Sequence, residues 1–294
     1  MKEENFKVNI TLLKKISKES GIKKFFLGGS VTYLNVAKNL GIDFKCNDYD
    51  LAIIGGEKKF LQIKRILSKH KFRIIKARPY FLKFKKVFQI IAEKKDITLD
   101  IAILKNLNYL GHFNWESIFW EFPSGKLYDP YESIKSIKKR ELKLIILPEE
   151  ENPLILASRF SKLCARFNLD ISNNKELFQL TQKLSILISN WKSEDSFQGE
   201  YAREHSYFGI LESILRAKDK YFFIRMLNSS GLFASFFPEL SKNIKNKNLK
   251  LKKINSVKNM NELINFFKNF LLNKKDLREF NKKIKVISRR IRKN

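Results

Sequence analysis

The apolar residues of this chain change their periodicity after Pro148. Up to that point, short apolar runs typical of strands are interspersed with helical segments, whereas beyond it apolar residues recur only at helical intervals. The expected strands are 24–27, 48–54, 72–76, 80–84, 87–92 and 98–104, and the expected helices are 6–19, 31–40 and 60–70. Because several strands follow one another directly, this pattern predicts an α+β domain with a mixed sheet and flanking helices, followed by an all-α region.

The boundary between the two regions is marked by an acidic run at 149–151, followed by Asn152 and Pro153. Acidic groups stabilise the N-terminal end of a helix, and proline is tolerated in a first helical turn, so a helix is expected to begin here. Later residues, 241–259, are rich in Lys and Asn and predict a loose linker before an amphipathic helix at 261–272. The predicted organisation is 1–147 as the α+β domain, 148–242 as a helical domain, and 243–294 as a Lys-rich linker with a basic helical tail.

The chain carries a net charge of +29, with 59 basic against 30 acidic residues in 294. A charge of this size favours a polyanionic partner, with nucleic acid ahead of an anionic membrane surface. An AT-rich genome would also enrich Lys, Ile and Asn, but it does not obviously suppress Glu. No apolar run reaches the roughly 18 residues of a membrane span, and the two cysteines form no CxxC motif. We therefore expect a reduced, cytoplasmic protein without a disulfide framework or zinc site.

Three carboxylates are the strongest chemical signal. Asp48 and Asp50 are one residue apart on an expected strand, so they project to the same side, and Asp100 lies in a second apolar strand. If those strands are neighbours, three carboxylates converge and require cations to offset their repulsion. Two Mg²⁺ ions suit such a site, where one activates an attacking hydroxyl and the other holds a triphosphate. An Asp-x-Asp pair alone is a weak signal, because many such pairs lie in turns or on solvated faces.

A glycine turn precedes the carboxylates. Gly28 and Gly29 allow close approach of the backbone to a phosphate, and Ser30 begins a helix whose free N–H groups attract anions. Alone, this could be a plain turn with Ser30 as a helix cap. The order of strand, Gly-Gly-Ser, helix, Asp-x-Asp strand and later Asp strand instead indicates a site for a nucleoside triphosphate and its magnesium ions.

That order resembles the nucleotidyltransferase superfamily, and further segments resemble the bacterial-type (class II) CCA-adding enzymes and poly(A) polymerases. The segment Leu127-Tyr128-Asp129-Pro130 is similar to the one that closes their head domain. Glu151-Asn152-Pro153-Leu154, with 157–167, resembles their EDPLR…LRFAARLGF helix, and Gly231-Leu232-Phe233 with Phe237-Pro238-Glu239-Leu240 resembles their GLL…FPEL segment. These matches run from about residue 24 to 240.

The resemblance implies a head, neck and body, and a Mg²⁺-dependent enzyme that adds nucleotides from ATP or CTP to an RNA 3′ end, most naturally that of tRNA. It assigns metal binding and catalysis to Asp48, Asp50 and Asp100, and nucleotide binding to Gly28, Gly29, Ser30, Glu151, Asn152 and Arg159. The basic tail, with Lys282, Lys283, Arg289, Arg290 and Arg292, is expected to contact RNA phosphates. A solvated helix end is the alternative interpretation of this tail.

The chain departs from the family pattern at several positions. Thr32-Tyr33 stand where the family has Arg-Asp, and 111–117 lacks the arginines and aspartate of the family's RRDFTINA segment. Ile155 replaces the arginine of EDxxR, with Arg159 one helical turn further on. These departures motivate one alternative, a non-catalytic RNA-binding protein on the same fold. A further alternative is a transferase that modifies a small molecule or protein, although the basic charge argues against it.

Overall fold

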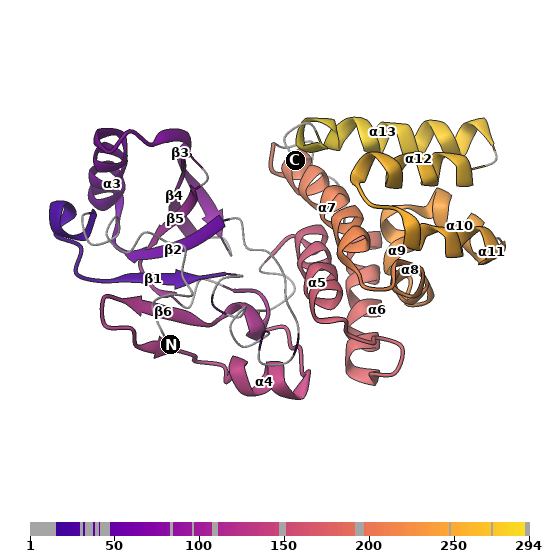
Figure 1. Cartoon of the computed structure of the whole chain (residues 1–294), viewed down its shortest axis with the longest axis horizontal. Coiled ribbons are helices and arrows are strands. Elements are labelled where there is room, and N and C mark those ends of the chain that lie inside the picture. Colours follow the sequence, from indigo (N-terminus) through magenta and orange to yellow (C-terminus); the bar gives the residue numbers. More distant parts are fainter. Residues whose placement is uncertain are drawn as a thin grey trace. The chain divides into compact units, whose positions relative to one another are not determined.

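The computed structural model describes residues 16–29, 32, 38, 41, 48–82, 85–95, 97–107, 111–146, 151–191, 197–246, 248–271 and 273–291. The chain divides into two compact units, Met1–Glu151 and Asn152–Asn294 (Figure 1). The first contains a β-sheet with helices and the second is helical, so the predicted fold class is confirmed. Among the described residues, no helix has both the length and the apolar content that crossing a membrane requires.

The first unit is built on a seven-stranded mixed sheet, with the order β3-β4-β5-β2-β1-β6-β7. The pair β2–β5 is parallel and the other neighbouring strands are antiparallel. The strands are β1 (Phe25–Gly28), β2 (Asp48–Ile54), β3 (Arg73–Leu82), β4 (Lys85–Lys94), β5 (Ile97–Leu104), β6 (Phe119–Phe122) and β7 (Leu127–Tyr128). This order places β5, β2 and β1, which carry the predicted site residues, next to one another.

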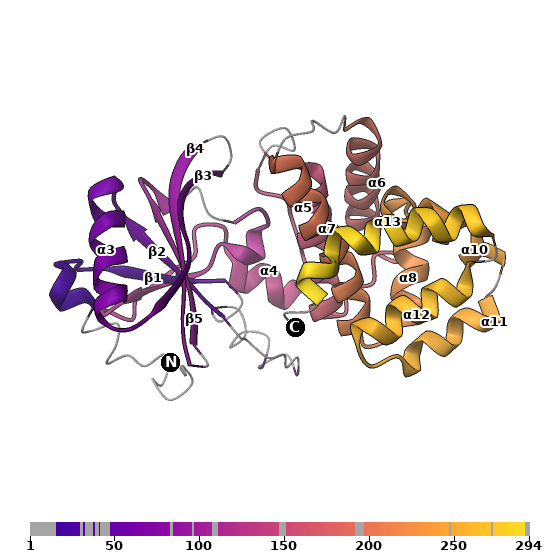
Figure 2. The same ribbon diagram turned by 90° about the horizontal axis from the view of Figure 1, so that it is seen from above.

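Helix α3 (Glu57–Lys69) covers one face of this sheet, as Figures 1 and 2 show. Its buried side chains pack against the apolar residues of the strands in one cluster, which includes Phe60, Ile63, Leu67, Leu51, Ile53, Leu99, Ile101 and Ile103. Because side chains alternate along a strand, Asp50 and Asp100 project from the opposite face. The apolar residues at odd-numbered positions of β2 and β5 are buried under α3, so these two carboxylates, at even-numbered positions, lie on the other side of the sheet.

Two features of this unit differ from the sequence expectation. Residues 72–76 and 80–84 were expected as separate strands, but β3 runs from Arg73 to Leu82 and pairs with β4 along that length, with an irregularity between Ile74 and Lys76. Pro79 is accommodated because β3 is an edge strand, where the missing N–H is tolerated. The short strands β6 and β7 were not anticipated, since four and two residues are too few to show a period.

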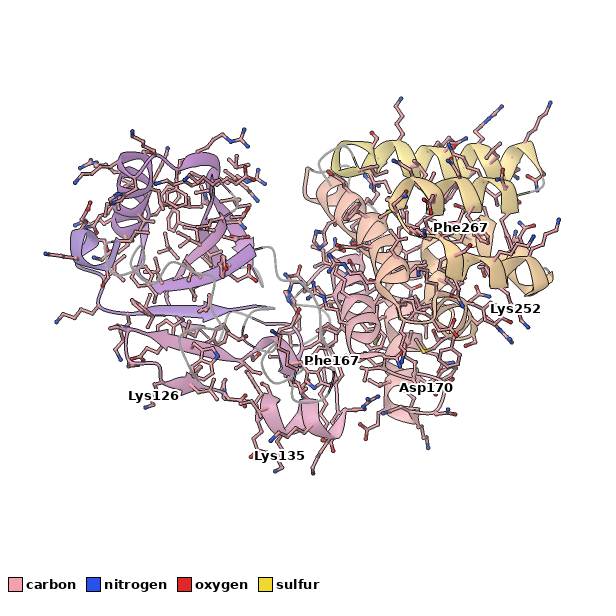
Figure 3. All side chains as sticks on the ribbon, in the orientation of Figure 1. Lys126, Lys135, Phe167, Asp170, Lys252 and Phe267 are labelled. Carbon is pink, nitrogen blue, oxygen red and sulfur yellow. The ribbon has the colours of Figure 1, made fainter. Side chains whose placement is uncertain are left out.

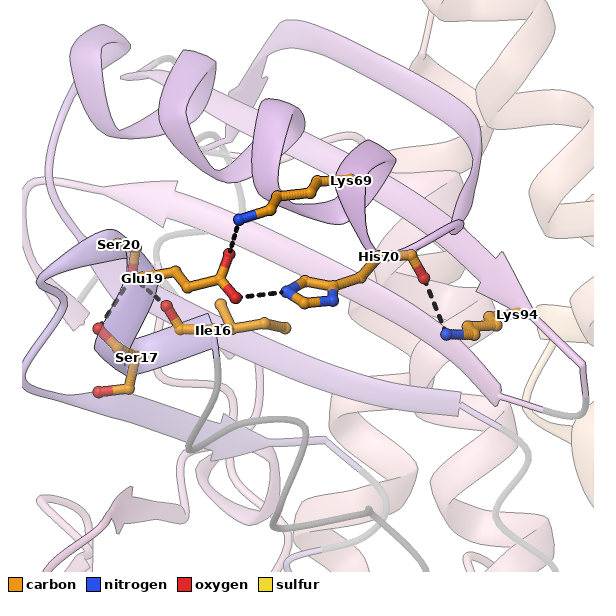
Figure 4. Close-up of polar contacts among 7 residues, drawn as sticks. All are labelled: Ile16, Ser17, Glu19, Ser20, Lys69, His70 and Lys94. Carbon is orange, nitrogen blue, oxygen red and sulfur yellow. Dashed lines mark hydrogen bonds and ion pairs between the residues drawn. The ribbon is translucent and has the colours of Figure 1, made fainter.

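A helical turn at residues 16–20 is attached to the end of α3 (Figure 4). The Glu19 carboxylate accepts a hydrogen bond from Lys69 Nζ at 3.2 Å and lies 3.0 Å from His70 Nε2. Lys94 Nζ in turn donates to the carbonyl of His70 at 2.8 Å. These contacts link the chain before β1 to α3 and β4. The rest of the helix expected at 6–19 lies outside the described residues.

The second unit consists of helices packed around an aromatic core. Four phenylalanine rings contact one another in this core, with 5.5–6.3 Å between the centres of neighbouring rings: Phe233, Phe237, Phe267 and Phe280. The elements are α5 (Pro153–Phe167), α6 (Lys175–Asn190), α7 (Phe197–Arg216), α8 (Lys220–Ser229), α9 (Leu232–Phe236), α10 (Pro238–Asn246), α11 (Asn248–Leu251), η5 (Lys252–Ser256), α12 (Met260–Phe270) and α13 (Lys274–Ile291). Figure 3 labels Phe267, which is buried in this core, and Lys252, which is exposed.

The loose linker expected at 241–259 was wrong. Most of this range is helical, in α10, α11 and η5, and its apolar residues Ile244, Leu251 and Ile254 are buried. The prediction followed composition, because Lys and Asn outnumber the five apolar residues of this range, although several of those apolar residues are three or seven positions apart, as in a helix.

Candidate functional site

Asp50 and Asp100 lie directly opposite each other on the parallel strands β2 and β5. Residues paired in this way project from the same face of a sheet, on strands about 4.8 Å apart. The two strands are therefore neighbours, which is the condition that the metal-site hypothesis set. Asp48 begins β2, opposite Thr98, but its side chain lies outside the described part of the structure.

The glycine turn adjoins the same carboxylates. Gly28 is paired with Asp50 in the antiparallel ladder of β1 and β2. Gly29 has a φ of +66°, and a Cβ built on it would overlap the Asp50 carboxylate, at 2.7 Å from Cγ. A side chain at position 29 is thus opposed both by the backbone conformation and by the space available. The glycine lets the backbone turn away directly beside the carboxylate.

Thr32 stabilises the backbone turn that follows Gly29. Its backbone N–H and its Oγ1 both donate to the carbonyl of Gly29, at 3.2 and 2.7 Å. Ser30, and most of the helix expected at 31–40, lie outside the described residues. Thr32, which stands where the resembled family has an arginine, is buried and contributes to the turn itself.

Gln89 on β4 completes the described part of the site. Its Nε2 donates to Oδ1 and to Oδ2 of Asp100, at 2.8 Å in each case. Gln89 was not anticipated from the sequence, because nothing in the strand 87–92 distinguishes it from any other solvated polar residue. It holds the third predicted carboxylate in a fixed orientation.

Carboxylates placed side by side on neighbouring strands repel each other, and like charges directly opposite in a sheet are destabilising. A cation bound between two carboxylates offsets such repulsion. Oxygen ligands of this kind suit a hard cation such as Mg²⁺. Within the described residues, no group of three His, Cys, Asp or Glu side chains is positioned to hold a metal. Asp50 and Asp100 are the described carboxylates of the predicted metal site, and Asp48 remains its predicted third ligand.

Two residues predicted to bind nucleotide have other contacts. Glu151 Oε2 lies 2.8 Å from Nε2 of His112, a buried residue whose Nδ1 is 3.6 Å from Glu116. The Asn152 side chain caps α5 by accepting from the backbone N–H of Leu154 at 3.0 Å. The helix start expected at Asn152 and Pro153 is thus confirmed. In each of these two side chains, one oxygen therefore makes a structural contact within the protein.

Arg159 lies in α5, in a basic row with Lys162 and Arg166 at helical spacing. Burial lowers the pKa of Lys162 below its usual value, and both arginines add to that lowering. Glu212 on α7 opposes it, with Oε2 3.0 Å from Lys162 Nζ and Oε1 2.7 Å from an Arg216 nitrogen. Lys162 and Arg216 therefore pair with one carboxylate while Arg159 and Arg166 add positive charge near Lys162, so basic groups outnumber acidic ones in this part of the second unit.

The basic tail is part of α13, and its lysines do not all face solvent. Lys282 is exposed and pairs with Glu279 at 2.8 Å. The side chain of Lys283 is only 17% exposed and pairs with Glu239, itself 4% exposed, at 2.6 Å. This burial does not fit the RNA contact predicted for Lys283. Arg289 and Arg290 belong to α13, but their side chains, like all of Arg292, lie outside the described part.

The outer side of α13 nevertheless carries a basic row that sequence reasoning identified only in part. Lys274, Arg278, Lys282 and Lys285 line a shallow hollow of about 410 Å³, together with Leu277 and Asn281. Their spacing of three or four residues places them on one side of the helix. The hollow is therefore a positively charged groove along the surface of α13.

The chain has the same fold as a solved CCA-adding enzyme. It matches an apo form of that enzyme with a TM-score of 0.58 and 15% sequence identity, over 93% of this chain and 64% of the other. It also matches a structure described as a tRNA-processing enzyme, with a TM-score of 0.52 and 14% identity, over 91% of this chain and 79% of the other. The chain thus spans less than two thirds of the length of the CCA-adding enzyme. No protein-family model and no curated protein matches the sequence.

Proposed function

We propose that this protein is an RNA nucleotidyltransferase that adds nucleotides from ATP or CTP to an RNA 3′ end, with Mg²⁺ as its cofactor. The observation that carries the proposal is the position of Asp50 opposite Asp100, on adjacent strands and beside the Gly28–Gly29 turn. Repelling carboxylates beside a turn of glycine backbone match the needs of a metal-bound triphosphate.

In this proposal Asp50, Asp100 and Asp48 hold the metal ions. Bound Mg²⁺ would lower the pKa of the attacking 3′-hydroxyl and neutralise charge on the triphosphate. Gly28 and Gly29 keep the backbone free of side chains where the phosphates approach. Positioning and charge neutralisation supply most of the catalysis of such a transfer, so few other catalytic side chains are needed.

The RNA part of the proposal is supported by charge. The chain has a net charge of +29, and the second unit contains the basic row on α5 and the groove on α13. Phosphate contacts of this kind give an affinity that falls steeply as salt is raised. One of the structures with this fold is named as a CCA-adding enzyme and another as a tRNA-processing enzyme, which favours tRNA as the substrate.

The direct test is incorporation of labelled ATP or CTP into a tRNA that lacks its 3′ end. The wild-type protein should incorporate label in the presence of Mg²⁺, and Asp50→Asn and Asp100→Asn should not. Absence of incorporation with any nucleotide, together with normal RNA binding, would remove the proposed activity. Equal transfer with and without RNA would instead indicate a small-molecule or protein acceptor.

A second candidate function, RNA binding without catalysis, is favoured by a specific observation. Glu151 is engaged by His112, Asn152 caps α5, and Ile155 cannot read a base by hydrogen bonding. A protein of this kind would bind RNA equally well as wild type and as Asp50→Asn, and neither form would incorporate nucleotide. The incorporation assay therefore separates the two functions.

A further inference from the structure

The amide of Gln89 occupies a specific position on the Asp100 carboxylate. Its nitrogen is 2.8 Å from both oxygens, so it lies on the line that bisects the carboxylate. A cation that binds a carboxylate through both oxygens at once needs that same position. Gln89 therefore occupies the position that two-oxygen binding at Asp100 requires, so a cation at this carboxylate would bind through a single oxygen.

We propose that Gln89 is a positioning residue that restricts Asp100 to single-oxygen coordination and thereby makes the site prefer Mg²⁺ over Ca²⁺. This inference rests on the proposed function, in that it takes Asp50 and Asp100 as metal ligands. Mg²⁺ demands a small octahedral shell and is bound through single carboxylate oxygens, whereas Ca²⁺ takes more ligands and accepts a carboxylate through both oxygens.

The surrounding sheet keeps Gln89 in place. It lies in the middle of β4, opposite Ala102 of β5 on one side and Arg78 of β3 on the other. Both ladders continue on either side of this position, so the backbone of Gln89 cannot shift without breaking pairing on two strands. An amide on such a rigid element holds its ligand more precisely than one on a loop.

The substitutions Gln89→Met and Gln89→Glu test this role. Met retains the approximate length of the side chain and removes the amide donor. Glu retains the shape but, when ionised, cannot donate to Asp100 and adds a carboxylate. Gln89→Met therefore leaves both oxygens of Asp100 available to one cation, and Gln89→Glu adds a second carboxylate that can bind the same cation. Gln62→Met is the matched control, because Gln62 lies on α3, which covers the opposite face of the sheet.

The measurement is metal binding by the whole protein without nucleotide or RNA. Electron paramagnetic resonance measures the concentration of free Mn²⁺, and the bound amount follows by difference from the total. Mg²⁺ and Ca²⁺ are then added separately as competitors, which gives the affinity for each. Wild type and Gln62→Met should bind Mg²⁺ more tightly than Ca²⁺. In Gln89→Met and Gln89→Glu, the ratio of Ca²⁺ to Mg²⁺ affinity should rise at least tenfold.

An unchanged ratio in either folded Gln89 variant would overturn the role of Gln89. Asp50→Asn separates this failure from failure of the metal site itself, since it should lose Mn²⁺ binding if Asp50 is a ligand. Absence of Mn²⁺ binding by wild type would overturn both proposals. A shifted ratio in a protein that incorporates no nucleotide would uphold the role of Gln89 and overturn only the proposed activity.

Discussion

Gly29 lies against the carboxylate of Asp50, so that a Cβ at position 29 would come within 2.7 Å of Asp50 Cγ. We therefore expect Gly29→Ala to displace the carboxylate and lower the rate of nucleotide incorporation about 100-fold, the size of effect that a 1 Å displacement produces. The left-handed backbone adds a stability cost of about 1–2 kcal/mol. Steady-state kinetics and urea unfolding measure the two effects.

Gly21→Ala is the matched control for this substitution. Gly21 has a φ of +60°, close to that of Gly29, but a Cβ there meets nothing within 4 Å. The control should carry the same backbone cost of about 1–2 kcal/mol with no loss of rate. If both variants lose activity equally, the contact between Gly29 and Asp50 has no part in the site.

Removing one charge from the carboxylate pair should separate stability from function. We expect Asp50→Asn to lower incorporation by about a thousandfold or more, because metal ligation contributes several kcal/mol. Without Mg²⁺, relief of the repulsion from Asp100 should offset the loss of other contacts of the Asp50 carboxylate, so the free energy of unfolding should change by no more than about 1 kcal/mol. Thermal unfolding with and without Mg²⁺ should show a stabilising shift in wild type and none in the variant.

Asp170→Asn serves as the comparison. Asp170 accepts hydrogen bonds from Ser172 and Asn173 in a turn of the second unit, whereas the carboxylate pair belongs to the sheet of the first. It should keep the full Mg²⁺-dependent shift. A Mg²⁺ shift retained in Asp50→Asn would mean that the ion binds elsewhere.

Lys282 and Lys283 are neighbours on α13, but we expect one to contribute to RNA binding and the other to stability. Lys283→Ala leaves Glu239 buried without its partner and removes a cation that lies 5.5 Å from the ring centre of Phe237. We expect a loss of about 3 kcal/mol in the free energy of unfolding. Lys282→Ala, at an exposed position, should leave stability unchanged but reduce the slope of log affinity for RNA against log salt by about 1.

Urea unfolding and RNA binding at several salt concentrations test both lysine variants. The two substitutions remove the same side chain from neighbouring residues, so each is the control for the other. A stable Lys283→Ala protein with a reduced salt slope would restore Lys283 as a phosphate contact.

The apolar pattern located the site-bearing strands, but it did not determine which strands pair in the sheet. Asp50 and Asp100 could be placed on strands because each lies in a run of β-branched and aliphatic residues, and parallel pairing then brought them together. Gln89 could not be found in this way. Its role depends on which oxygen atoms of a distant residue it reaches, and that information is absent from the local sequence pattern.

In the basic tail on α13, the sequence prediction grouped residues that the helix separates. Composition grouped Lys282 and Lys283 as one basic stretch, although helical spacing places adjacent residues about 100° apart around the axis. Once α13 forms, Lys283 faces Glu239 and the aromatic core while Lys282 faces solvent. The later part of α10, which packs with α13, had also been predicted as a linker, so nothing in the sequence indicated that one side of α13 would be buried.

The ion pair of Glu212 with Lys162 gives the second unit a defined response to acid. Burial by itself raises the pKa of Glu212, but Lys162 and Arg216 outweigh this effect and hold the pKa below its ordinary value. A carboxyl with a lowered folded-state pKa stabilises the fold above its unfolded pKa of about 4.3 and loses that contribution as the pH falls through the folded value. Wild-type stability should therefore decline below about pH 5 more steeply than that of Glu212→Gln.

Glu212→Gln should also cost about 1–2 kcal/mol at neutral pH, because Lys162 is left in a buried, positive environment and the pair is only partly exposed. Chemical unfolding between pH 3 and 7 measures both the slope and the cost. Glu176→Gln, at an exposed position in the first turn of α6, should cost less than about 1 kcal/mol and should keep the wild-type slope below pH 5. If Glu212→Gln shows the wild-type slope below pH 5, the acid response arises from other carboxylates and the Glu212–Lys162 pair does not control it.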